Sequence, residues 1–169
     1  VFVGPCAAKK LEASRKSVRS EVDFVLTFEE IGAMFEAKGI DFASLKPDEA
    51  DPFTQASSDG RGFAVSGGVA KAVVNCIKAK EPEREVLVES AEGLANCKKM
   101  LKLAKSGKYD GYLLEGMACP GGCVAGAGTL LPITRATTAV KKYTNSSDKL
   151  NANDSKYKDY LERLIEEYK

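Results

Sequence analysis

Short apolar runs alternate with segments of helical spacing along most of this sequence, and that alternation constrains the fold more than any other feature. Four runs are predicted to be strands, and they lie at residues 1–3, 23–26, 85–88 and 109–115. The segments between them place apolar side chains at the three- and four-residue spacing of an amphipathic helix. Alternation of this kind predicts an α/β fold, in which a mostly parallel sheet is flanked by helices.

Helix boundaries are predicted from capping residues and apolar spacing. Thr27 and Glu30 have the spacing of a capping box, and their helix is expected to stop near Gly39. Further helices are predicted to begin at residues 66–68 and to cover 94–105, about 135–143 and about 156–168. The expected apolar faces contain Ile31, Met34 and Phe35; Val69, Val73 and Ile77; and Leu94, Cys97, Leu101 and Ala104. The polar residues 47–62 are expected to form a long loop.

Composition and charge exclude several classes of protein. The chain has 169 residues, enough for one domain with a hydrophobic core. Lys and Arg number 25 and Asp and Glu number 24, a balance that argues against a nucleic-acid partner. No apolar stretch approaches the ~20 residues of a membrane span, and no signal peptide is visible, so no membrane association is expected. The apolar start at Val1 is interpreted as a cut through a larger protein.

The cysteine and histidine counts narrow the metal chemistry. Five cysteines, an odd number, in a chain without a secretion signal favour a reducing, cytoplasmic location. The sequence contains no histidine, the commonest ligand of zinc and copper. Any metal is therefore expected to be bound through thiolate or carboxylate groups.

One cysteine-rich segment directly follows a predicted strand, and it reads Glu115-Gly116-Met117-Ala118-Cys119-Pro120-Gly121-Gly122-Cys123. Ligands of open parallel sheets bind at the carboxyl ends of the strands. Glycines beside a thiolate allow close backbone approach, and we expect their N–H groups to point at sulfur. The Cys-x3-Cys spacing is typical neither of a zinc ribbon nor of a thioredoxin-like pair. Two structural cysteines beside a glycine turn are the alternative, but this combination of residues favours a metal–sulfide site.

Another cysteine follows the first predicted strand, in the segment Gly4-Pro5-Cys6-Ala7-Ala8-Lys9. A buried Cys6 after a proline turn, with a solvated Lys9, explains this segment if it is taken alone. In the functional interpretation Cys6 is a metal ligand, and Lys9 brings a hydrogen-bond donor and a positive charge to the same site. Cys76 and Cys97 fall on apolar helix faces and are expected to be ordinary core cysteines.

Together the two segments resemble the second and third signature motifs of the iron-only (FeFe) hydrogenases, over roughly residues 1–135. The second motif reads Met-Pro-Cys-x-x-Lys-x-x-Glu, and Pro5, Cys6, Lys9 and Glu12 match it. The third reads Glu-x-Met-Ala-Cys-x-Gly-Gly-Cys, and every specified position of residues 115–123 matches. Residues 49–52 and 63–69 resemble segments between these motifs. The resemblance implies one lobe of the hydrogenase catalytic domain, in the C-terminal part of the large subunit.

The resemblance also implies a cofactor and its ligands. Cys6, Cys119 and Cys123 correspond to three of the four cysteines that bind the 4Fe–4S part of the H-cluster. Cys123 corresponds to the cysteine whose sulfur also bridges to the di-iron unit. The implied reaction is the reversible reduction of protons to dihydrogen, with electrons from ferredoxin or from internal iron–sulfur domains.

The pocket around the di-iron unit is implied in the same way. Lys9 corresponds to the lysine that hydrogen-bonds a cyanide ligand of the distal iron, and it is expected to have a catalytic role together with Met117. The residues expected to bind the cofactor are Lys9, Phe63, Val69 and Met117. An apolar wall of this kind would keep water away from the open iron site.

The sequence departs from the family pattern in three places. The first motif, Thr-Ser-Cys-Cys-Pro, would lie upstream of Val1, so residues 1–169 are expected to be a partial H-cluster domain that lacks its N-terminal lobe. Gly4 replaces a methionine beside the di-iron unit, and residues 126–130 replace the usual Gly-Gly-Gly-Gln-Pro. Residues 150–169 are expected to be a helical extension. The chain alone is expected to be inactive and to hold no cluster without the upstream lobe as its partner.

Other functions remain open from the sequence. The change at Gly4 is of the kind expected in a hydrogen-sensing homologue with low turnover. An iron–sulfur assembly relative without the di-iron unit is a further alternative, although Lys9 and Met117 weigh against it. The exposed lysines of residues 94–105 are interpreted as a solvated face, with docking of an acidic electron carrier as the second interpretation.

Overall fold

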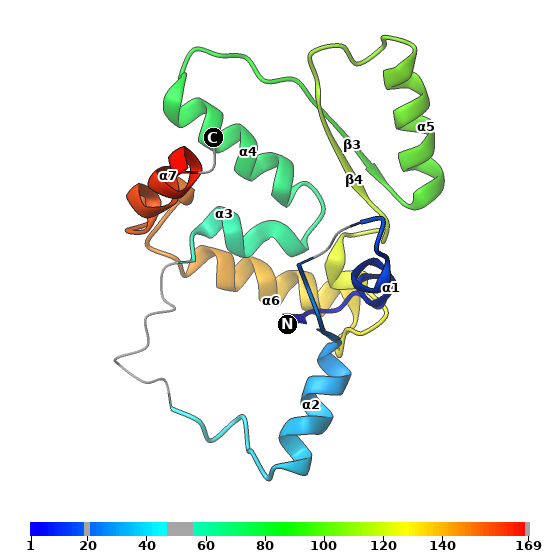
Figure 1. The fold of residues 1–169 in the computed structure, drawn as a ribbon, viewed down its shortest axis with the longest axis vertical. Helices are drawn as coiled ribbons and strands as arrows, with labels where there is room; N and C mark the ends of the chain where they lie inside the picture. The colour runs from blue at the N-terminus through cyan, green and yellow to red at the C-terminus, as the bar shows by residue number, and fades with distance from the viewer. Residues whose placement is uncertain (19–20, 47–55, 168–169) are drawn as a thin grey trace.

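Two pairs of parallel strands organise the fold, and the computed structural model describes residues 1–18, 21–46 and 56–167 of it (Figure 1). β1 (Phe2–Val3) pairs with β2 (Val25–Leu26), and β3 (Val88–Glu92) pairs with β4 (Leu113–Met117). The predicted parallel pairing is confirmed. The prediction of a single sheet is wrong, because within the described ranges the strands form two separate two-stranded sheets. β1 and β2 have two residues each, since the turn at Gly4 and the next helix end them.

Helices connect and cover these strand pairs, as parallel pairing requires. They are α1 (Ala8–Ser14), α2 (Phe28–Ala37), α3 (Ser58–Arg61), α4 (Gly68–Lys80), α5 (Leu94–Lys105), α6 (Ile133–Asn145) and α7 (Lys158–Glu167). Short 3-10 turns lie at η2 (Gly62–Ala64), η3 (Cys123–Ala125) and η4 (Ala152–Asp154). Among the described residues, none of these helices combines the length and the apolar character needed to cross a membrane.

The predicted capping box is confirmed at the start of α2. The Glu30 N–H donates to Thr27 Oγ1 at 3.3 Å, and the Thr27 N–H donates to Glu30 Oε2 at 2.8 Å. Lys10 Nζ also donates to Glu30, at 2.8 Å, and to the Val25 carbonyl oxygen, at 2.8 Å. These bonds join α1, β2 and α2, and they lower the pKa of Glu30, mainly through Lys10 and then through the Thr27 N–H.

The predicted loop 47–62 is wrong for its last part. Residues 58–61 form α3, because the Ser57 side chain accepts a bond from the Gly60 N–H at 3.1 Å and caps a short helix. Residues 47–55, which include the family-like segment 49–52, lie outside the described residues.

The second strand pair is shifted toward the C-terminus of each predicted strand. The expected strand 85–88 is found at Val88–Glu92, and the expected strand 109–115 at Leu113–Met117. Its register runs from Val88 opposite Leu113 to Glu92 opposite Met117. Pairing with β4 thus extends β3 through polar residues that local preference would not select.

Helix α5 has the predicted bounds but a different buried face. Leu94 and Leu101 are 74% and 59% exposed, whereas Met100 is buried. The Cys97 Sγ lies 3.3 Å from where a Cβ of Gly116 would be, and the Met100 Cε lies 3.9 Å from that point. Because Gly116 of β4 has no side chain, Cys97 and Met100 can pack there, and this determines which face of α5 lies against the sheet.

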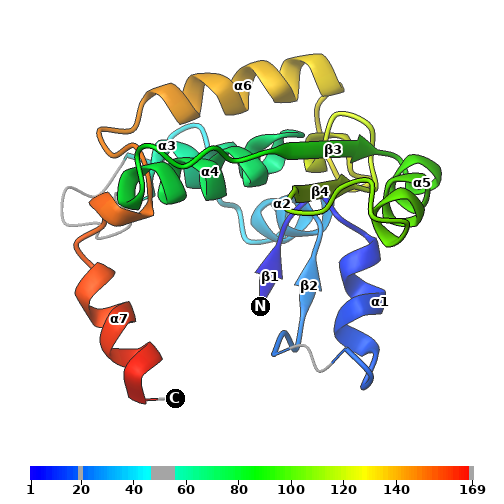
Figure 2. The ribbon, with the colours of Figure 1, turned by 90° about the horizontal axis from the view of Figure 1, so that it is seen from above.

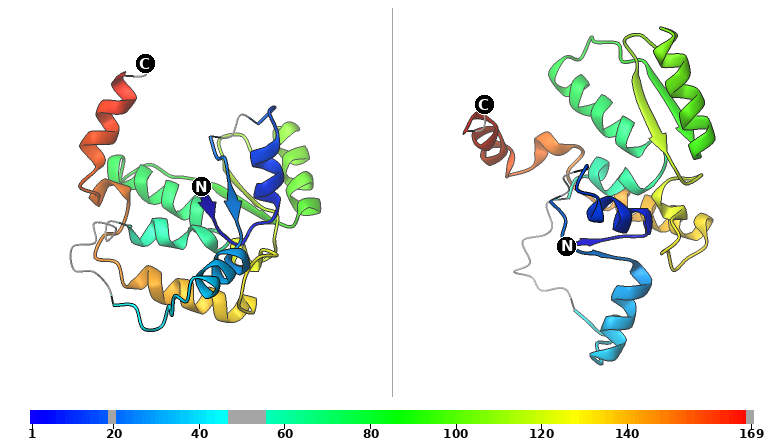
Figure 3. Two further views of the ribbon diagram at one scale, coloured as in Figure 1. Left: turned by 60° about the horizontal axis from the view of Figure 1, so that its bottom comes forward. Right: turned by 45° about the vertical axis from the view of Figure 1, so that its right-hand side comes forward.

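The helices and strands spread outward and do not pack into one closed domain (Figure 2). α3 packs against α4 and α6, α5 covers the β3–β4 pair, and α1 packs against β2. α7 follows η4 and projects away from the other helices (Figure 3). The 150–169 extension, as a domain boundary, remains a prediction.

The apolar core is thinner than expected for a domain of this length. The chain exposes 12620 Å², whereas a compact monomer of its mass exposes about 8100 Å². The buried apolar residues, among those described, are Val25, Ala70, Ala72, Met100, Val124 and Ala136. Several large side chains, such as Phe24 and Phe42, are more than two-thirds exposed at 68% and 69%. The described residues thus form a hydrophobic core, but it consists of few and mostly small side chains.

Candidate metal centre

The two cysteine-bearing segments follow parallel strands, as predicted. Cys6 lies in the turn between β1 and α1, and the Gly4 N–H donates to the Leu26 carbonyl oxygen at 3.0 Å as this turn begins. Cys119 and Cys123 lie in the segment after β4, and residues 119–123 are called the cysteine loop below. Both segments thus leave the carboxyl end of a strand.

Backbone contacts join these segments directly. The Gly128 N–H donates to the Pro5 carbonyl oxygen at 2.9 Å. A Cβ at Gly126 would clash with the same oxygen, and a Cβ at Gly128 would lie 2.6 Å from the Thr27 Cβ. Only glycine permits this approach. The chain after Cys123 is therefore packed against the residue that precedes Cys6.

The thiols of the two segments interact electrostatically. Partial burial raises the pKa of Cys123, and the neighbouring Cys6 and Cys119 thiols raise it further, while the Lys9 ammonium lowers it. Cys6, Cys119 and Lys9 thus lie within electrostatic reach of Cys123. Repulsion among three thiolates favours a site in which bound metal neutralises them.

The donor set fits an iron–sulfur cluster better than a single ion. In residues 1–18, 21–46 and 56–167, no group of three His, Cys, Asp or Glu side chains is placed to hold one metal ion. A 4Fe–4S cluster takes each thiolate at a different iron, so its ligands lie farther apart than those of one ion. Soft thiolates without imidazole also select iron–sulfur chemistry. Cys6, Cys119 and Cys123 are the thiol donors that the two cysteine segments offer.

Lys9 is engaged in a surface ion pair. Its Nζ donates to both carboxylate oxygens of Glu12, at 2.8 and 2.9 Å, and both side chains are 42% exposed. A pair this exposed is weak and exchanges with solvent. Lys9 therefore acts on the cysteines through its charge, and its N–H groups bond to Glu12.

The other predicted pocket residues are separated. Val69 and Met117 line one cavity of about 220 Å³ between α4 and β4. Phe63 instead lines a different, open apolar cavity of about 370 Å³, together with Cys76. Val73 of α4 borders both cavities. The structure thus brings Val69 and Met117 together and leaves Phe63 apart from them.

Glu115, a motif residue without an assigned role, caps α4. Its carboxylate is 6% exposed and accepts the Gly67 N–H at 2.6 Å and the Ala70 N–H at 3.0 Å. The N-cap residue Gly67 has no side chain to serve these donors. The sequence contained a signal for this contact: a helix that begins at two glycines has no capping side chain of its own, so its first N–H groups need an acceptor from elsewhere in the chain.

The glycine N–H groups of the cysteine loop do not point at sulfur, contrary to expectation. The Gly121 N–H donates to Glu92 Oε2 at 3.0 Å, and the Gly122 N–H donates to the Cys119 carbonyl oxygen at 3.0 Å. The reason is that the loop turns tightly here, with φ of 92° at Gly121 and 97° at Gly122. The Cys123 N–H interacts with its own sulfur and lowers the pKa of that thiol.

The two remaining cysteines lie outside this site. The Cys97 Sγ lies 3.5 Å from the Ala91 carbonyl oxygen and 3.6 Å from that of Met117, in the contact between α5 and the sheet. Cys76 is half-buried in α4. Both positions agree with the interpretation of these residues as ordinary packing cysteines.

Comparison with known proteins gives a consistent result. Residues 1–127 match the family model described as the iron only hydrogenase large subunit, C-terminal domain. The periplasmic Fe hydrogenase large subunit of Nitratidesulfovibrio vulgaris is 31% identical over 159 residues, which cover 76% of this chain and 38% of the relative. Iron hydrogenase 1 of Clostridium pasteurianum is 31% identical, with 76% of this chain and 28% of the relative covered.

Relatives with another function are nearly as similar. Cytosolic iron-sulfur assembly component 3 of Mus musculus is 29% identical over 166 residues, which cover 77% of this chain and 35% of the relative. Among solved structures, the FeFe-hydrogenase HydA1 of Chlamydomonas reinhardtii superposes with a TM-score of 0.62 at 21% identity, over 98% of this chain and 57% of that structure. This likeness concerns the fold. The chain spans well under half the length of the curated relatives that it matches.

Proposed function

The chain belongs to the family of the iron-only hydrogenase large subunit, C-terminal domain, and we propose that it forms part of a hydrogenase that reversibly reduces protons to dihydrogen. In this proposal Cys6, Cys119 and Cys123 hold three corners of the 4Fe–4S part of an H-cluster. An upstream hydrogenase lobe supplies the fourth cysteine, and the 169 residues alone are inactive.

The observation that carries the proposal is the convergence of the cysteine segments. The bond from Gly128 to Pro5 and the mutual effect of the three thiols on Cys123 support a shared site. Two of these thiols come from one motif and the third from another, far apart in the sequence. Chance packing of ordinary cysteines would not require glycines at both contact positions, Gly126 and Gly128.

The residues of the chain would have different roles at this site. The three thiolates orient the cluster, and the Lys9 charge offsets their negative charge. Val69 and Met117 provide apolar surface that excludes water from the neighbouring cavity. When bound, the cluster would pass on electrons from the electron partner and would provide the open iron site at which protons and dihydrogen interconvert.

Gly4 supports a hydrogen-sensing homologue with low turnover as a second candidate. A Cβ at Gly4 would lie 2.7 Å from the Phe2 Cε1, so the Phe2 ring fills space next to the buried glycine. The wall beside Cys6 thus differs from the family pattern, in which methionine stands at this position. An altered wall is consistent with a site tuned for binding hydrogen rather than for turnover.

Assembly of iron–sulfur clusters is the third candidate. The similarity to cytosolic iron-sulfur assembly component 3 supports it, because that relative covers 77% of this chain, nearly the same share as the 76% covered by the periplasmic Fe hydrogenase. In this case the cysteines would bind a 4Fe–4S cluster without a di-iron unit. Lys9 would then have no cyanide ligand to contact.

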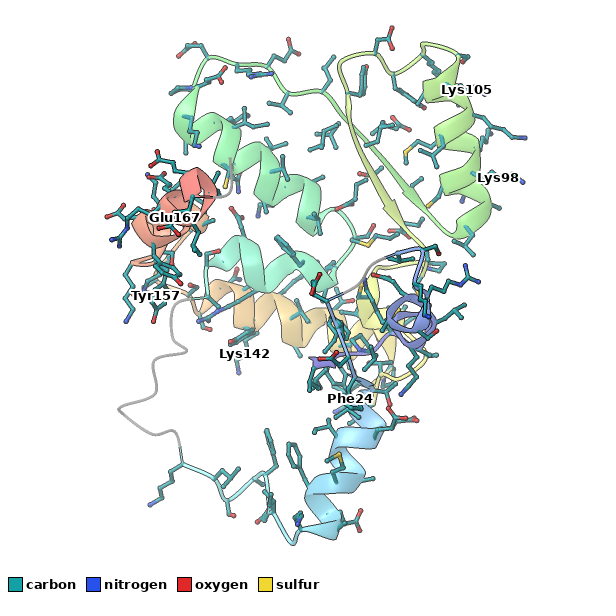
Figure 4. The ribbon with its side chains drawn as sticks, viewed as in Figure 1. Phe24, Lys98, Lys105, Lys142, Tyr157 and Glu167 are labelled. Atoms are coloured by element: carbon teal, nitrogen blue, oxygen red, sulfur yellow. The ribbon has the colours of Figure 1, made fainter. Side chains whose placement is uncertain are left out.

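An acidic electron carrier such as ferredoxin, or an attached iron–sulfur domain, is proposed as the electron partner. The exposed side of α5 carries four lysines without an acidic residue, and Lys98 and Lys105 point away from the rest of the chain (Figure 4). These are Lys98, Lys99, Lys102 and Lys105. Charges of one sign steer a partner of the opposite sign. A cytoplasmic location is part of the same proposal.

Anaerobic expression of the complete gene product with hydrogenase maturation proteins tests these candidates. Infrared bands of metal-bound carbonyl and cyanide, with hydrogen evolution, are expected for a hydrogenase. Bands without appreciable turnover would favour the sensor, and a 4Fe–4S signal without bands would favour the assembly relative. Cys119→Ser should abolish the iron signal, whereas the matched control Cys76→Ser should retain it. Loss of iron in both variants, or in neither, contradicts the proposed ligand set.

A further inference from the structure

Glu92 connects β3 to the cysteine loop. It is the last residue of the strand, and its Oε2 accepts the Gly121 N–H at 3.0 Å. The Ser66 side chain interacts with the same carboxylate, and this interaction first and the bond from the Gly121 N–H second lower the pKa of Glu92. The Gly121 carbonyl oxygen in turn accepts the Ser66 N–H at 3.2 Å. The backbone N–H and C=O of Gly121 are thus both bonded to residues from outside the loop.

We propose that Glu92 is a positioning residue for Cys119 and Cys123: its carboxylate holds the Gly121 N–H and so fixes the loop that carries both thiols. Glu92 matches neither of the two cysteine motifs. This inference deepens the proposed function. Only the expected effect on cluster binding rests on that function. The contact itself involves only groups of this chain.

The composition of the loop makes an external contact important. Gly121 and Gly122 both have positive φ, and glycine has more conformational freedom to lose than any other residue. Such a loop has little intrinsic preference for the shape seen here. Gly122 packs closely against Ser66 on one side, since a Cβ added at Gly122 would lie 2.5 Å from the Ser66 nitrogen. The bond to Glu92 restrains the neighbouring Gly121 from the side of β3.

The contact is charge-assisted but lies at the surface. Hydrogen bonds from N–H groups to carboxylates are stronger than neutral ones, whereas exposure to water weakens them. Removal of the carboxylate is therefore expected to loosen the loop without unfolding the chain. Glutamine at this position keeps an acceptor oxygen at the same reach and should largely restore the contact.

Amide exchange of the metal-free gene product tests the positioning role without any cluster. Hydrogen–deuterium exchange is measured by mass spectrometry on the peptide that contains residues 118–125. Glu92→Ala should speed exchange at Gly121 by about three- to tenfold, and Glu92→Gln should stay within about twofold of the parent protein. Glu89→Ala is the matched control. It removes the same charge from β3 at a position whose side chain faces the other side of the strand.

A second readout connects the contact to cluster binding. In protein reconstituted with iron and sulfide, Glu92→Ala should release iron to a chelator several-fold faster than Glu89→Ala, and Glu92→Gln should reverse most of this change. Exchange in Glu92→Ala equal to that of the parent protein would overturn the inference. Equal acceleration in Glu89→Ala would also overturn it. If no variant binds iron, the proposed function fails, and the exchange result still decides the role of Glu92.

Discussion

The Gly128 N–H donates to the Pro5 carbonyl oxygen at 2.9 Å, and this bond fixes the chain after the cysteine loop to the residue before Cys6. Neither residue carries a functional group in its side chain. The meeting of the cysteine segments thus depends on backbone approach, which glycines at 126 and 128 make possible.

Gly126→Ala is expected to force the two cysteine segments apart. Its Cβ would clash with the Pro5 carbonyl oxygen, a backbone atom that cannot move away easily. The free energy of unfolding, measured in urea, should fall by about 1–3 kcal/mol. Gly32→Ala is the control, because nothing lies within 4 Å of its Cβ position in α2. That change should stabilise the protein by about 0.5–1 kcal/mol. Equal stabilities for both variants would mean that the segments are not in close contact.

Glu115→Ala should destabilise the start of α4. It leaves the Gly67 and Ala70 N–H groups without their acceptor in a buried position. A loss of about 1–3 kcal/mol is expected in urea unfolding. Glu115→Gln keeps one acceptor oxygen and should recover part of the loss. A neutral effect of Glu115→Ala would show that other groups cap this helix.

The Cys123 thiol should react slowly with alkylating reagents at neutral pH in the metal-free protein. Its raised pKa means that less of it is present as thiolate at a given pH. Lys9→Met removes a charge that lowers this pKa and should slow the reaction further. Cys119→Ser removes a group that raises the pKa and should speed it. Mass spectrometry of iodoacetamide labelling against pH checks both directions, and a common rate in all three proteins would contradict the shared site.

Glu30 should contribute a pH-dependent part of the stability. Its pKa is lowered in the folded chain, first by the bond from Lys10. A lowered carboxylate pKa stabilises the fold above the unfolded value and loses this effect as the pH falls through the folded value. Glu30→Gln should therefore make the loss of stability between about pH 5 and pH 3 shallower. Glu29→Gln changes the same helix turn without touching the Lys10 contact and should leave the slope unchanged.

The sequence predicts the features that depend on neighbours in the chain. The capping box of Thr27 and Glu30 and the bounds of α5 follow from local spacing, and the structure has both. The two cysteine motifs also identified the segments that meet. Their roles as cluster ligands remain predictions.

Features that depend on distant contacts were not predictable in the same way. The register of β3 is set by β4, and the buried face of α5 is set by the space above Gly116. Glu92 reaches the cysteine loop only because its strand lies beside β4. No local pattern distinguishes such a glutamate from one that points into solvent.

The contact between Pro5 and Gly128 closes a loop of roughly 120 residues, and long loops of this kind close late when a chain folds. The thiols of Cys119 and Cys123 would then be neighbours long before Cys6 joins them. Cluster insertion should accordingly follow folding rather than direct it. Pulsed thiol labelling during refolding of the metal-free protein would show this order as late protection of Cys6, and simultaneous protection of all three would speak against it.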